Sequence, residues 1–435
     1  MTICVLGLWH LGSVTAACCA RHFEVVGLDF DLEVVEGLQQ GRAPLLEPGL
    51  NELLAEGLTS GRLRFTTDPA SACSRVDVLW VCHDTPVNDR DESDSAYVLE
   101  RLRKALAVLP AGALVIISSQ LPVGTCGRLE EEFPLFQFAC SPENLRLGRA
   151  LDAFTRADRV VVGVRSQAGR GLLEQLFRPF TPQVLFMRTE SAEMVKHALN
   201  SFLAVSVTFI NEIARLCERT GADAGEVSAG LKSDARIGPR AYLGPGGPFA
   251  GGTLARDVVT LTRLAREHHE PLALIPAIQQ SNEAHRGWAL RTLEDRLGPL
   301  AGRTVAVLGL VYTPNTDTLR RSAAVELGQA LRAAGACVQA HDPALPPGPG
   351  GAAPPSTRGA LEGMKLAADL AGALREADAA VVSTEWPQFR TADWAALAAL
   401  MRQPVFVDAN RFLEKELKGL PRVEHLSVGR PGNSS

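Results

Sequence analysis

A short glycine-containing turn near the start of the chain has the spacing of a dinucleotide-binding loop. Gly7 and Gly12 enclose Leu8-Trp9-His10-Leu11, after an apolar run and before a small-residue helical segment. In such loops the glycines make the turn, admit the pyrophosphate and let the helix pack on the strand. Asp29 follows the next apolar run, where a carboxylate would bind the ribose hydroxyls. Because Asp29 would repel a 2′-phosphate, the pattern predicts NAD rather than NADP.

The second glycine of this fingerprint is replaced by Trp9. Two explanations are open, a reshaped pyrophosphate loop and a weakened cofactor site. A strand-to-helix turn without any cofactor is a third. The strand-turn-helix context and the spacing from Gly7 to Asp29 favour the dinucleotide.

Two residues in the middle of the chain could act on a reacting oxygen. Lys196 and Asn200 are four apart in a segment with helical apolar spacing, so one helix face would carry both a cation and an amide. This pair suits an oxyanion or an ordered water. On a solvated helix face the same pair would have no chemical role.

The elements that must position these residues follow from the apolar patterns. In the first 190 residues, short β-branched runs alternate with helical patterns, which predicts a doubly wound parallel sheet. The predicted strands are Ile3 to Leu6, Val25 to Leu28, Val76 to Val81, Leu114 to Ser118 and Val160 to Val164.

The remainder of the chain divides into a helical middle and a second α/β segment. From Ser191 the apolar spacing is helical, interrupted by the Gly/Pro-rich loop Gly244 to Gly252. From Arg303 a second strand-turn-helix series begins, continued by Val338 to Ala340, Ala379 to Ser383 and Val405 to Val407. The predicted fold is therefore α/β, two Rossmann-like doubly wound domains joined by a helical middle domain. The expected bounds are 1–190, 191–290 and 291–435.

Composition restricts the class of protein. The 435 residues, 46% hydrophobic and 21% charged, are typical of a globular enzyme of several domains. The net charge of -5, with scattered basic residues, disfavours nucleic acid as a partner. Nine cysteines without Cys-x-x-Cys spacing predict reduced thiols and no metal site. Without a charged leader or a long apolar stretch, we expect a cytoplasmic protein that does not bind membranes.

Motifs along nearly the whole chain, residues 2 to about 415, resemble the UDP-glucose/GDP-mannose dehydrogenase family. The matching segments come in the family's order: Arg42 to Leu50 with Glu-Pro-Gly-Leu, Thr85-Pro86, Pro122-Val-Gly-Thr125, Pro142-Glu-Asn-Leu-Arg146, Ala157-Asp-Arg-Val-Val161, Ser191 to Asn200, Phe209 to Glu212, Asp234 to Gly238, Pro314 to Asp317 with Arg320, and Thr384-Glu-Trp386. The resemblance implies an NAD-dependent dehydrogenase of nucleotide sugars. The long middle helices imply a homodimer.

The family's site residues are carried over position by position. The resemblance implies catalytic roles for Lys196 and Asn200 at the reacting sugar carbon, for Asp257 in drawing the alcohol proton and for Glu143 as the base that activates water. It implies cofactor contacts at Gly7, Trp9, His10, Leu11, Gly12, Asp29, Thr85, Pro86 and Gln120. It implies substrate contacts at Glu143, Asn144, Leu145, Lys196, Asn200, Gly247, Gly251, Arg256, Arg320 and Arg411.

The catalytic loop departs from the family at its nucleophile. The run Ala250-Gly-Gly-Thr-Leu-Ala-Arg-Asp257 resembles the family's Gly-Gly-x-Cys-x-x-Lys-Asp, and Thr253 stands at the cysteine position. A thiolate adds to an aldehyde and leaves a thioester readily, whereas a threonine hydroxyl is barely ionised at neutral pH. Arg256 keeps the positive charge of the family's lysine.

Other departures also lie at chemical positions. Gln120 replaces a threonine next to the reacting carbon, Leu147 a glutamate, Thr313 a phosphate-side lysine and Asn410 the arginine of an Asp-x-Arg motif. Three interpretations follow. The leading one is a nucleotide-sugar oxidoreductase that removes one hydride and stops at the carbonyl. The alternatives are a full four-electron 6-dehydrogenase without a covalent intermediate, and a catalytically silent nucleotide-sugar binder.

Overall fold

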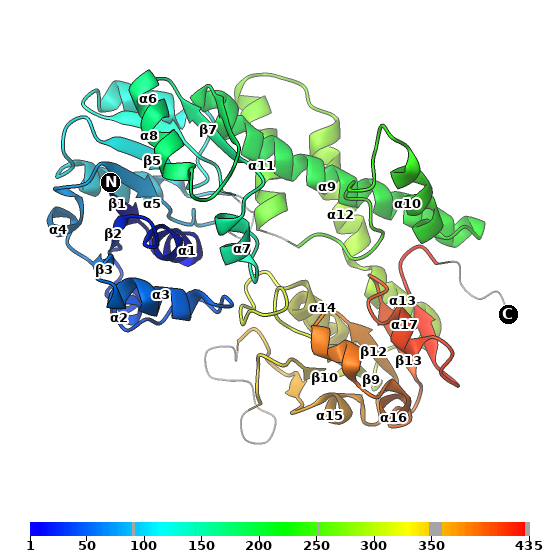
Figure 1. Ribbon diagram of the computed structural model, residues 1–435. Helices are drawn as coiled ribbons and strands as arrows, with labels where there is room; N and C mark the ends of the chain where they lie inside the picture. The colour runs from blue at the N-terminus through cyan, green and yellow to red at the C-terminus, as the bar shows by residue number, and fades with distance from the viewer. Residues whose placement is uncertain (89–91, 144, 251, 348–358, 431–435) are drawn as a thin grey trace. The chain divides into compact units, whose positions relative to one another are not determined.

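The computed structural model describes residues 1–88, 92–143, 145–250, 252–347 and 359–430. The chain divides into two compact units, Met1–Leu199 and Asn200–Ser435. Each unit contains one sheet (Figure 1). The three-domain bounds drawn from the sequence stay a prediction.

The sheet of the first unit has eight strands in the order β3-β2-β1-β4-β5-β6-β7-β8. Neighbours are parallel except β6 and β7. The strands are β1 (Thr2–Leu6), β2 (Glu24–Leu28), β3 (Leu63–Thr66), β4 (Val78–Val81), β5 (Leu114–Ile117), β6 (Gln137–Cys140), β7 (Val160–Val164) and β8 (Val184–Met187). This order, with crossovers on both sides of β1, is that of a doubly wound dinucleotide-binding sheet.

Helices cover both faces of this sheet. They are α1 (His10–Cys19), α2 (Leu32–Gln39), α3 (Leu50–Thr59), α4 (Pro69–Cys73), α5 (Ser95–Leu106), α6 (Thr125–Glu132), α7 (Ala150–Thr155) and α8 (Gln167–Phe177). On β1, Ile3 and Val5 pack in one apolar cluster with α1 and α3, whereas Cys4 and Leu6 pack in another with α4 and α5. Burial on both faces explains why the strands are nearly continuous apolar runs.

The register of β1 brings the nucleotide turn and the acidic residue together. Leu6, the last residue of β1, pairs with Leu28 of β2 and with Val81 of β4. The three strands therefore end level, so that Gly7, Asp29 and Cys82 leave the sheet at the same edge. This edge, where the strand order reverses beside β1, is where open α/β sheets bind ligands.

A long helix, α9 (Thr189–Thr220), begins in the first unit and continues into the second. The other helices of the second unit are α10 (Ala224–Ser233), α11 (Thr253–Glu267), α12 (Leu274–Arg286), α13 (Trp288–Leu297), α14 (Ala323–Ala333), α15 (Leu370–Leu374), α16 (Trp394–Ala398), α17 (Glu414–Leu417) and the 3-10 helix η3 (Pro387–Thr391). The helical pattern predicted for the middle of the chain is confirmed.

The sheet of the second unit has six parallel strands in the order β11-β10-β9-β12-β13-β14. They are β9 (Thr304–Leu308), β10 (Cys337–His341), β11 (Lys365–Leu366), β12 (Ala379–Val382), β13 (Val405–Asp408) and β14 (Glu424–Leu426). Its central strands repeat the β3-β2-β1-β4 arrangement. The predicted pair of Rossmann-like domains with a helical middle is therefore confirmed.

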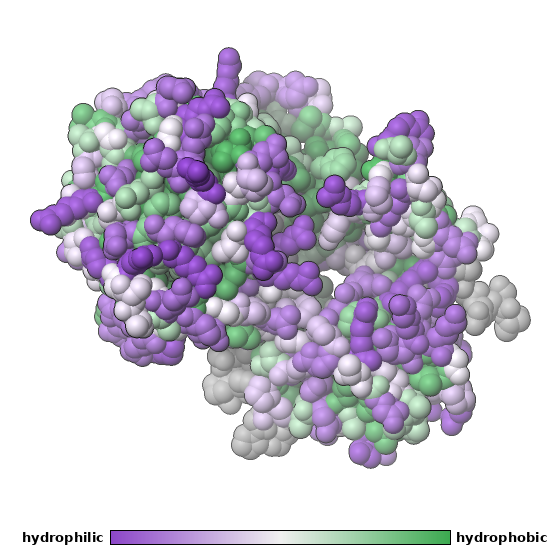
Figure 2. Space-filling view, in the orientation of Figure 1, coloured by the Kyte–Doolittle hydropathy of each residue, from purple (hydrophilic) through white to green (hydrophobic). Residues whose placement is uncertain are grey.

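Hydrophilic residues cover most of the face drawn in Figure 2, with apolar residues in small scattered groups. Among the described residues, no helix is long and apolar enough to cross a membrane.

Candidate active site

Steric contacts fix the two glycines of the nucleotide turn. Gly7 has φ +91°, and a Cβ there would lie 2.5 Å from Cγ of His83. A Cβ on Gly12 would lie 1.6 Å from the carbonyl oxygen of Gly7. Neither position accepts a side chain, so the turn can close only with glycine at both.

The residues between these glycines have separate environments. Trp9 is the N-cap of α1 with an extended backbone, φ -68° and ψ -154°, and is 42% exposed. Its backbone therefore needs no glycine, and the choice between a reshaped loop and a weakened one stays open. The side chain of Leu11 is buried in the apolar core. His10 Nε2 lies 2.8 Å from Oε2 of Glu47.

Glu47, from the Glu-Pro-Gly element, links three segments, although it was not among the site residues predicted from the sequence. Besides its contact with His10, it accepts backbone N–H groups from Gly148 and Ala150, each at 2.8 Å. Burial opposes the charge, but these hydrogen bonds keep the pKa of Glu47 below its usual value. The carboxylate therefore ties the start of α1 to the loop before α7.

Asp29 has acceptor capacity left for a ribose. It accepts the N–H of Leu8 at 2.6 Å and that of Asp31 at 3.1 Å, and is 8% exposed. Asp342, which follows β10 in the second sheet, accepts four donors from Leu310, Val311, Ala344 and the Trp386 indole. A carboxylate offers about four acceptor sites, so these four donors leave Asp342 less acceptor capacity than Asp29 has.

The first unit fits a dinucleotide on its own geometry. The glycine turn leads into the N-terminus of α1, which favours a pyrophosphate, and Asp29 lies level with it. His83 Nε2, beside Gly7, is buried without a hydrogen-bond partner in the described part of the chain. Thr85 donates to the carbonyl of Gln120 at 2.7 Å, and thereby connects the loops after β4 and β5. Pro86 follows Thr85 in the same loop.

Lys196 and Glu143 form a charged pair in the first unit. Lys196 Nζ, on α9, donates to the Glu143 carbonyl at 2.7 Å and lies 3.2 Å from its Oε1. The other carboxylate oxygen accepts the N–H of Leu145 at 2.7 Å. Lys196 is 8% exposed, so its charge acts in a poorly solvated place. Asn144 and Gly251, both expected to contact substrate, lie outside the described residues.

Asn200 and Asp257 form the corresponding pair in the second unit. Asn200 Nδ2 donates to Asp257 Oδ2 at 2.5 Å, and both residues are buried. Thr253 is the first residue of α11 and is exposed, whereas Asp257 lies one turn further along the same helix. Arg256, half-buried, lies between them on this helix.

Four side chains from three segments, which are α9, α12 and the turn after β13, hold the glycine loop before Thr253. Asn211 accepts the Gly246 N–H at 3.0 Å, and His285 Nε2 lies 2.8 Å from the Gly246 carbonyl. The Asn282 amide accepts the N–H of Phe249 and donates to its carbonyl. Asn410 accepts the N–H of Gly247 at 2.7 Å. The surrounding side chains therefore position the backbone of this loop rather than its side chains. Sequence motifs included Asn211 without a role and missed Asn282 and His285.

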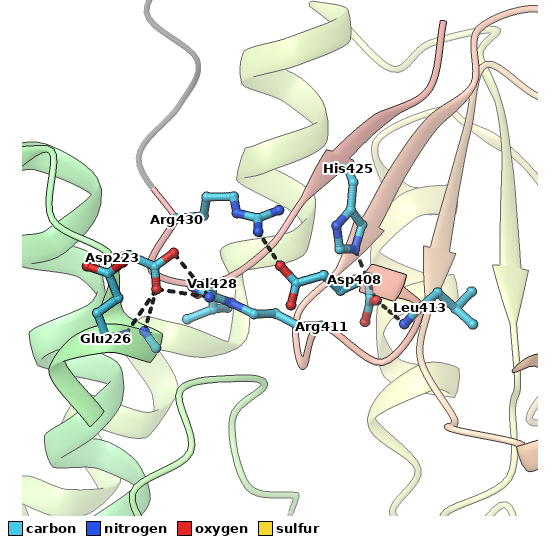
Figure 3. Close-up of polar contacts among 10 residues, drawn as sticks. Asp223, Glu226, Asp408, Arg411, Leu413, His425, Val428 and Arg430 are labelled. Carbon is cyan, nitrogen blue, oxygen red and sulfur yellow. Dashed lines mark hydrogen bonds and ion pairs between the residues drawn. The ribbon is translucent and has the colours of Figure 1, made fainter. Parts of the chain in front are cut away.

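The two arginines expected at the substrate differ in their surroundings. Arg320 is exposed. Arg411, with a left-handed φ of 58°, places its Nη1 2.9 and 3.1 Å from the Asp223 oxygens at the N-cap of α10 (Figure 3). Its Nη2 donates to the Val428 carbonyl at 3.4 Å. Arg411 thus connects three segments of the second unit, and its substrate role stays a prediction.

Models of three consecutive domains match most of the chain. The NAD binding domain of the UDP-glucose/GDP-mannose dehydrogenase family matches residues 1–181, its central domain residues 190–284 and its UDP binding domain residues 306–415. The chain belongs to this family. It is an NAD-dependent dehydrogenase of nucleotide sugars.

Relatives of known activity match over the full length. The UDP-glucose 6-dehydrogenase of Rhizobium meliloti strain 1021 is 34% identical, over 99% of this chain and 100% of the relative. TuaD of Bacillus subtilis strain 168, also a UDP-glucose 6-dehydrogenase, is 33% identical over 99% and 93%. The structure of the UDP-glucose dehydrogenase of Pyrobaculum islandicum has a TM-score of 0.87 at 30% identity, with 99% and 98% covered.

The family match makes the difference between Asp29 and Asp342 testable. We expect Asp29→Ala to weaken NAD binding roughly tenfold to a hundredfold, because charge-assisted hydrogen bonds to the ribose are lost. The matched control is Asp342→Asn, which should leave NAD affinity unchanged. Calorimetric titration of both variants measures the difference. Absence of NAD binding to the unaltered protein at millimolar concentration would contradict the site.

Two buried histidines of this dehydrogenase predict a loss of stability in acid. Burial lowers the pKa of His285 to about 4, although its hydrogen bond to Gly246 has a smaller effect in the opposite direction. Burial also lowers the pKa of His83 to about 4. Between pH 6.5 and 4 the unfolded chain therefore binds more protons than the folded one. Each histidine should cost about 2 kcal/mol of unfolding free energy between pH 7 and 5.

Urea unfolding at pH 7 and 5 measures this loss. His285→Gln keeps a donor for the Gly246 carbonyl and should remove roughly half of the pH dependence. Its stability at pH 7.5, where the histidine is neutral in both states, isolates the effect of the altered hydrogen bond. An unchanged pH dependence in this variant would contradict the assignment.

Proposed function

We propose that this protein oxidises a UDP-sugar by a single hydride transfer and releases the carbonyl compound or its hydrate. The observation that carries the proposal is Thr253 at the first position of α11, where the family's covalent chemistry uses a cysteine. The relatives that act on UDP-glucose support a UDP-hexose as substrate. The particular sugar is part of the proposal.

The chemistry of the available side chains supports a reaction without a covalent intermediate. Deprotonating a threonine hydroxyl near neutral pH costs several kcal/mol, because its pKa lies far above 7. None of the nine cysteines lies between residues 218 and 336, and eight of them are buried. Burial raises the pKa of Cys18 to about 12 and also raises the pKa values of Cys19 and Cys82. These thiols are poor nucleophiles.

The Lys196–Glu143 and Asn200–Asp257 pairs are sufficient for one oxidation step. When bound, NAD would accept the hydride of the alcohol carbon. The Asp257 carboxylate takes the proton of the alcohol oxygen, and a carbonyl remains. Asn200 orients this carboxylate through its 2.5 Å hydrogen bond. Lys196, one helical turn before Asn200 on α9, supplies the positive charge that favours the developing alkoxide.

Glu143 would act only on a hydrated product. In this proposal Glu143 is the base that would activate water. Its Oε1 lies 3.2 Å from Nζ of Lys196 in the first unit. The proposed substrate contacts of the second unit are Asn200, Gly247, Gly251, Arg256, Arg320 and Arg411. Those of the first unit are Glu143, Asn144, Leu145 and Lys196.

The number of NADH molecules formed per sugar consumed tests the proposal. One NADH with a carbonyl product is the expected result. Two NADH with a sugar carboxylate would show the full four-electron dehydrogenase. No NADH, with nucleotide sugar still bound, would show a silent binding protein. Mass spectrometry of the product separates these outcomes.

We also propose that two copies of the chain associate through α9. Phe202, Phe209 and Leu216 follow one another at intervals of seven residues on this helix and are 68%, 44% and 61% exposed. Residues seven apart lie on nearly the same helix face, so the three form one exposed apolar stripe. A second copy would cover the stripe with its own across a twofold axis.

Light scattering at micromolar concentration should give the mass of a dimer. Phe209→Asp is expected to shift it to a monomer, because an unpaired charge would enter the apolar interface. Leu135→Asp, at a leucine that is 67% exposed in the first unit, is the matched control and should stay dimeric. A monomeric mass for the unaltered chain would refute the proposal.

The proposed location is the cytoplasm. All nine cysteines are free, including Cys4 and Cys73, whose sulfur atoms lie 3.6 Å apart. Free thiols in such proximity are typical of a reducing compartment.

A further inference from the structure

His83, which lies beside Gly7 of the nucleotide turn, contacts two side chains that have not been assigned a role. His83 follows β4, and Tyr97 and Arg101 lie on α5. The rings of His83 and Tyr97 meet edge to face, with centroids 5.8 Å apart at 82°. The Arg101 guanidinium lies 3.5 Å from the Tyr97 ring centroid, and its Nη1 donates to the Tyr97 carbonyl at 3.2 Å. We call these three residues the α5 cluster.

The α5 cluster contains two buried polar atoms without partners. His83 Nε2 and Arg101 Nε have no hydrogen-bond partner in the described part of the chain, and His83 is only 5% exposed. Buried polar atoms are nearly always hydrogen-bonded, so two orphans in one contact cluster indicate a missing ligand or water. Burial keeps the pKa of His83 low, so its ring is neutral and offers one donor and one acceptor.

The position of the cluster restricts what that ligand is. Asp29, which would bind the ribose, is near enough for its charge to act on His83. The pyrophosphate side of the turn is α1, which packs in one apolar cluster of the sheet, whereas α5 packs in the other. A dinucleotide held at Asp29 therefore directs its pyrophosphate toward α1. The base on the same ribose extends away from α1, to the side of α5.

We propose that His83, Tyr97 and Arg101 bind the adenine base of NAD. Arg101 Nε–H and the His83 ring supply hydrogen bonds to the base nitrogens, and Tyr97 fixes both by ring contacts. The cluster recognises the adenosine end and does not touch the nicotinamide end. Arg101 is thereby a specificity-determining residue for the cofactor.

Binding of cofactor fragments to the full-length protein tests the proposal. Arg101→Met should weaken ADP-ribose and NAD each about tenfold, which corresponds to one lost hydrogen bond from a charged group. Affinity for nicotinamide mononucleotide should stay unchanged. Arg103→Met is the matched control on the same helix, because Arg103 is exposed and paired with Glu132 at 2.9 Å. It should leave the dissociation constant of ADP-ribose unchanged.

A second variant separates binding from folding. His83→Phe keeps the edge contact with Tyr97 and removes Nε2, so ADP-ribose should bind several-fold more weakly. A lower unfolding temperature in both variants with an unchanged dissociation constant for ADP-ribose would overturn the proposal, because the cluster would then be structural. A loss of affinity seen with NADP and not with NAD would overturn it as well, since Arg101 would then read a phosphate.

Discussion

Thr253→Cys is expected to convert this protein into one that releases a sugar carboxylate. A cysteine at the first position of α11 would lie at a helix N-terminus, where the thiolate is stabilised. The thiolate can trap the aldehyde as a thiohemiacetal, which donates a second hydride and leaves a thioester for hydrolysis. The several kcal/mol that a threonine alkoxide costs correspond to a rate difference of roughly a hundredfold or more.

The measurement is carboxylate and NADH formed per sugar consumed by the unaltered protein and the variant. The unaltered protein should give one NADH per sugar and the variant between one and two. Thr253→Ser, which keeps a hydroxyl, is the matched control and should form no carboxylate. Because Gln120 and Leu147 also differ from the family, partial conversion is the expected extent. Two NADH per sugar from the unaltered protein, at rates ordinary for enzymes, would refute the proposed role of Thr253.

Strands buried on both faces were predictable because their residues are almost continuously apolar. The run Ile3 to Leu6 is an example, and its strand β1 lies inside the first sheet, between β2 and β4. The strands that the sequence did not predict are peripheral or atypical. β3 alternates buried and exposed residues, β6 pairs antiparallel with β7, and β11 has only two residues. Short edge strands leave little apolar pattern to detect.

Motif positions could be predicted for the candidate site, but the contacts that hold them could not. The pairing of Asn200 with Asp257 joins residues 57 apart in the chain, and Glu47 reaches Ala150 over 103 residues. No local pattern encodes such distances. His83 was likewise missed, because only the level ends of β1 and β4 bring its ring onto Gly7.

Aspartates at equivalent positions of the two sheets accept different numbers of hydrogen bonds, which shows why a motif alone does not define a site. Asp29 and Asp342 both follow the strand next to the central one. Asp342 accepts four protein donors, three of them on Oδ2, whereas Asp29 accepts two backbone N–H groups. The acceptor capacity that remains, and not the position in the fold, favours Asp29 as the ribose ligand.

Asp257→Asn is expected to lower kcat by roughly 10²- to 10⁴-fold, the usual contribution of a general base. Asp257 is fully buried and accepts the Asn200 amide at 2.5 Å. An asparagine has the same shape and can still accept that hydrogen bond through its carbonyl oxygen. It cannot take the alcohol proton, so the loss of activity would isolate proton transfer from positioning.

Two measurements distinguish a loss of proton transfer by Asp257 from a loss of cofactor binding or a general effect on α11. The dissociation constant of ADP-ribose should be unchanged, because Asp257 is proposed to act on the sugar alcohol, whereas Asp29 is the proposed ligand of the ribose. Glu267→Gln, at an exposed carboxylate at the other end of α11, is the matched control and should keep kcat. If Asp257→Asn instead retains ordinary kcat, the alcohol proton leaves by another route. Lys196 with Glu143 would then be the pair to alter next.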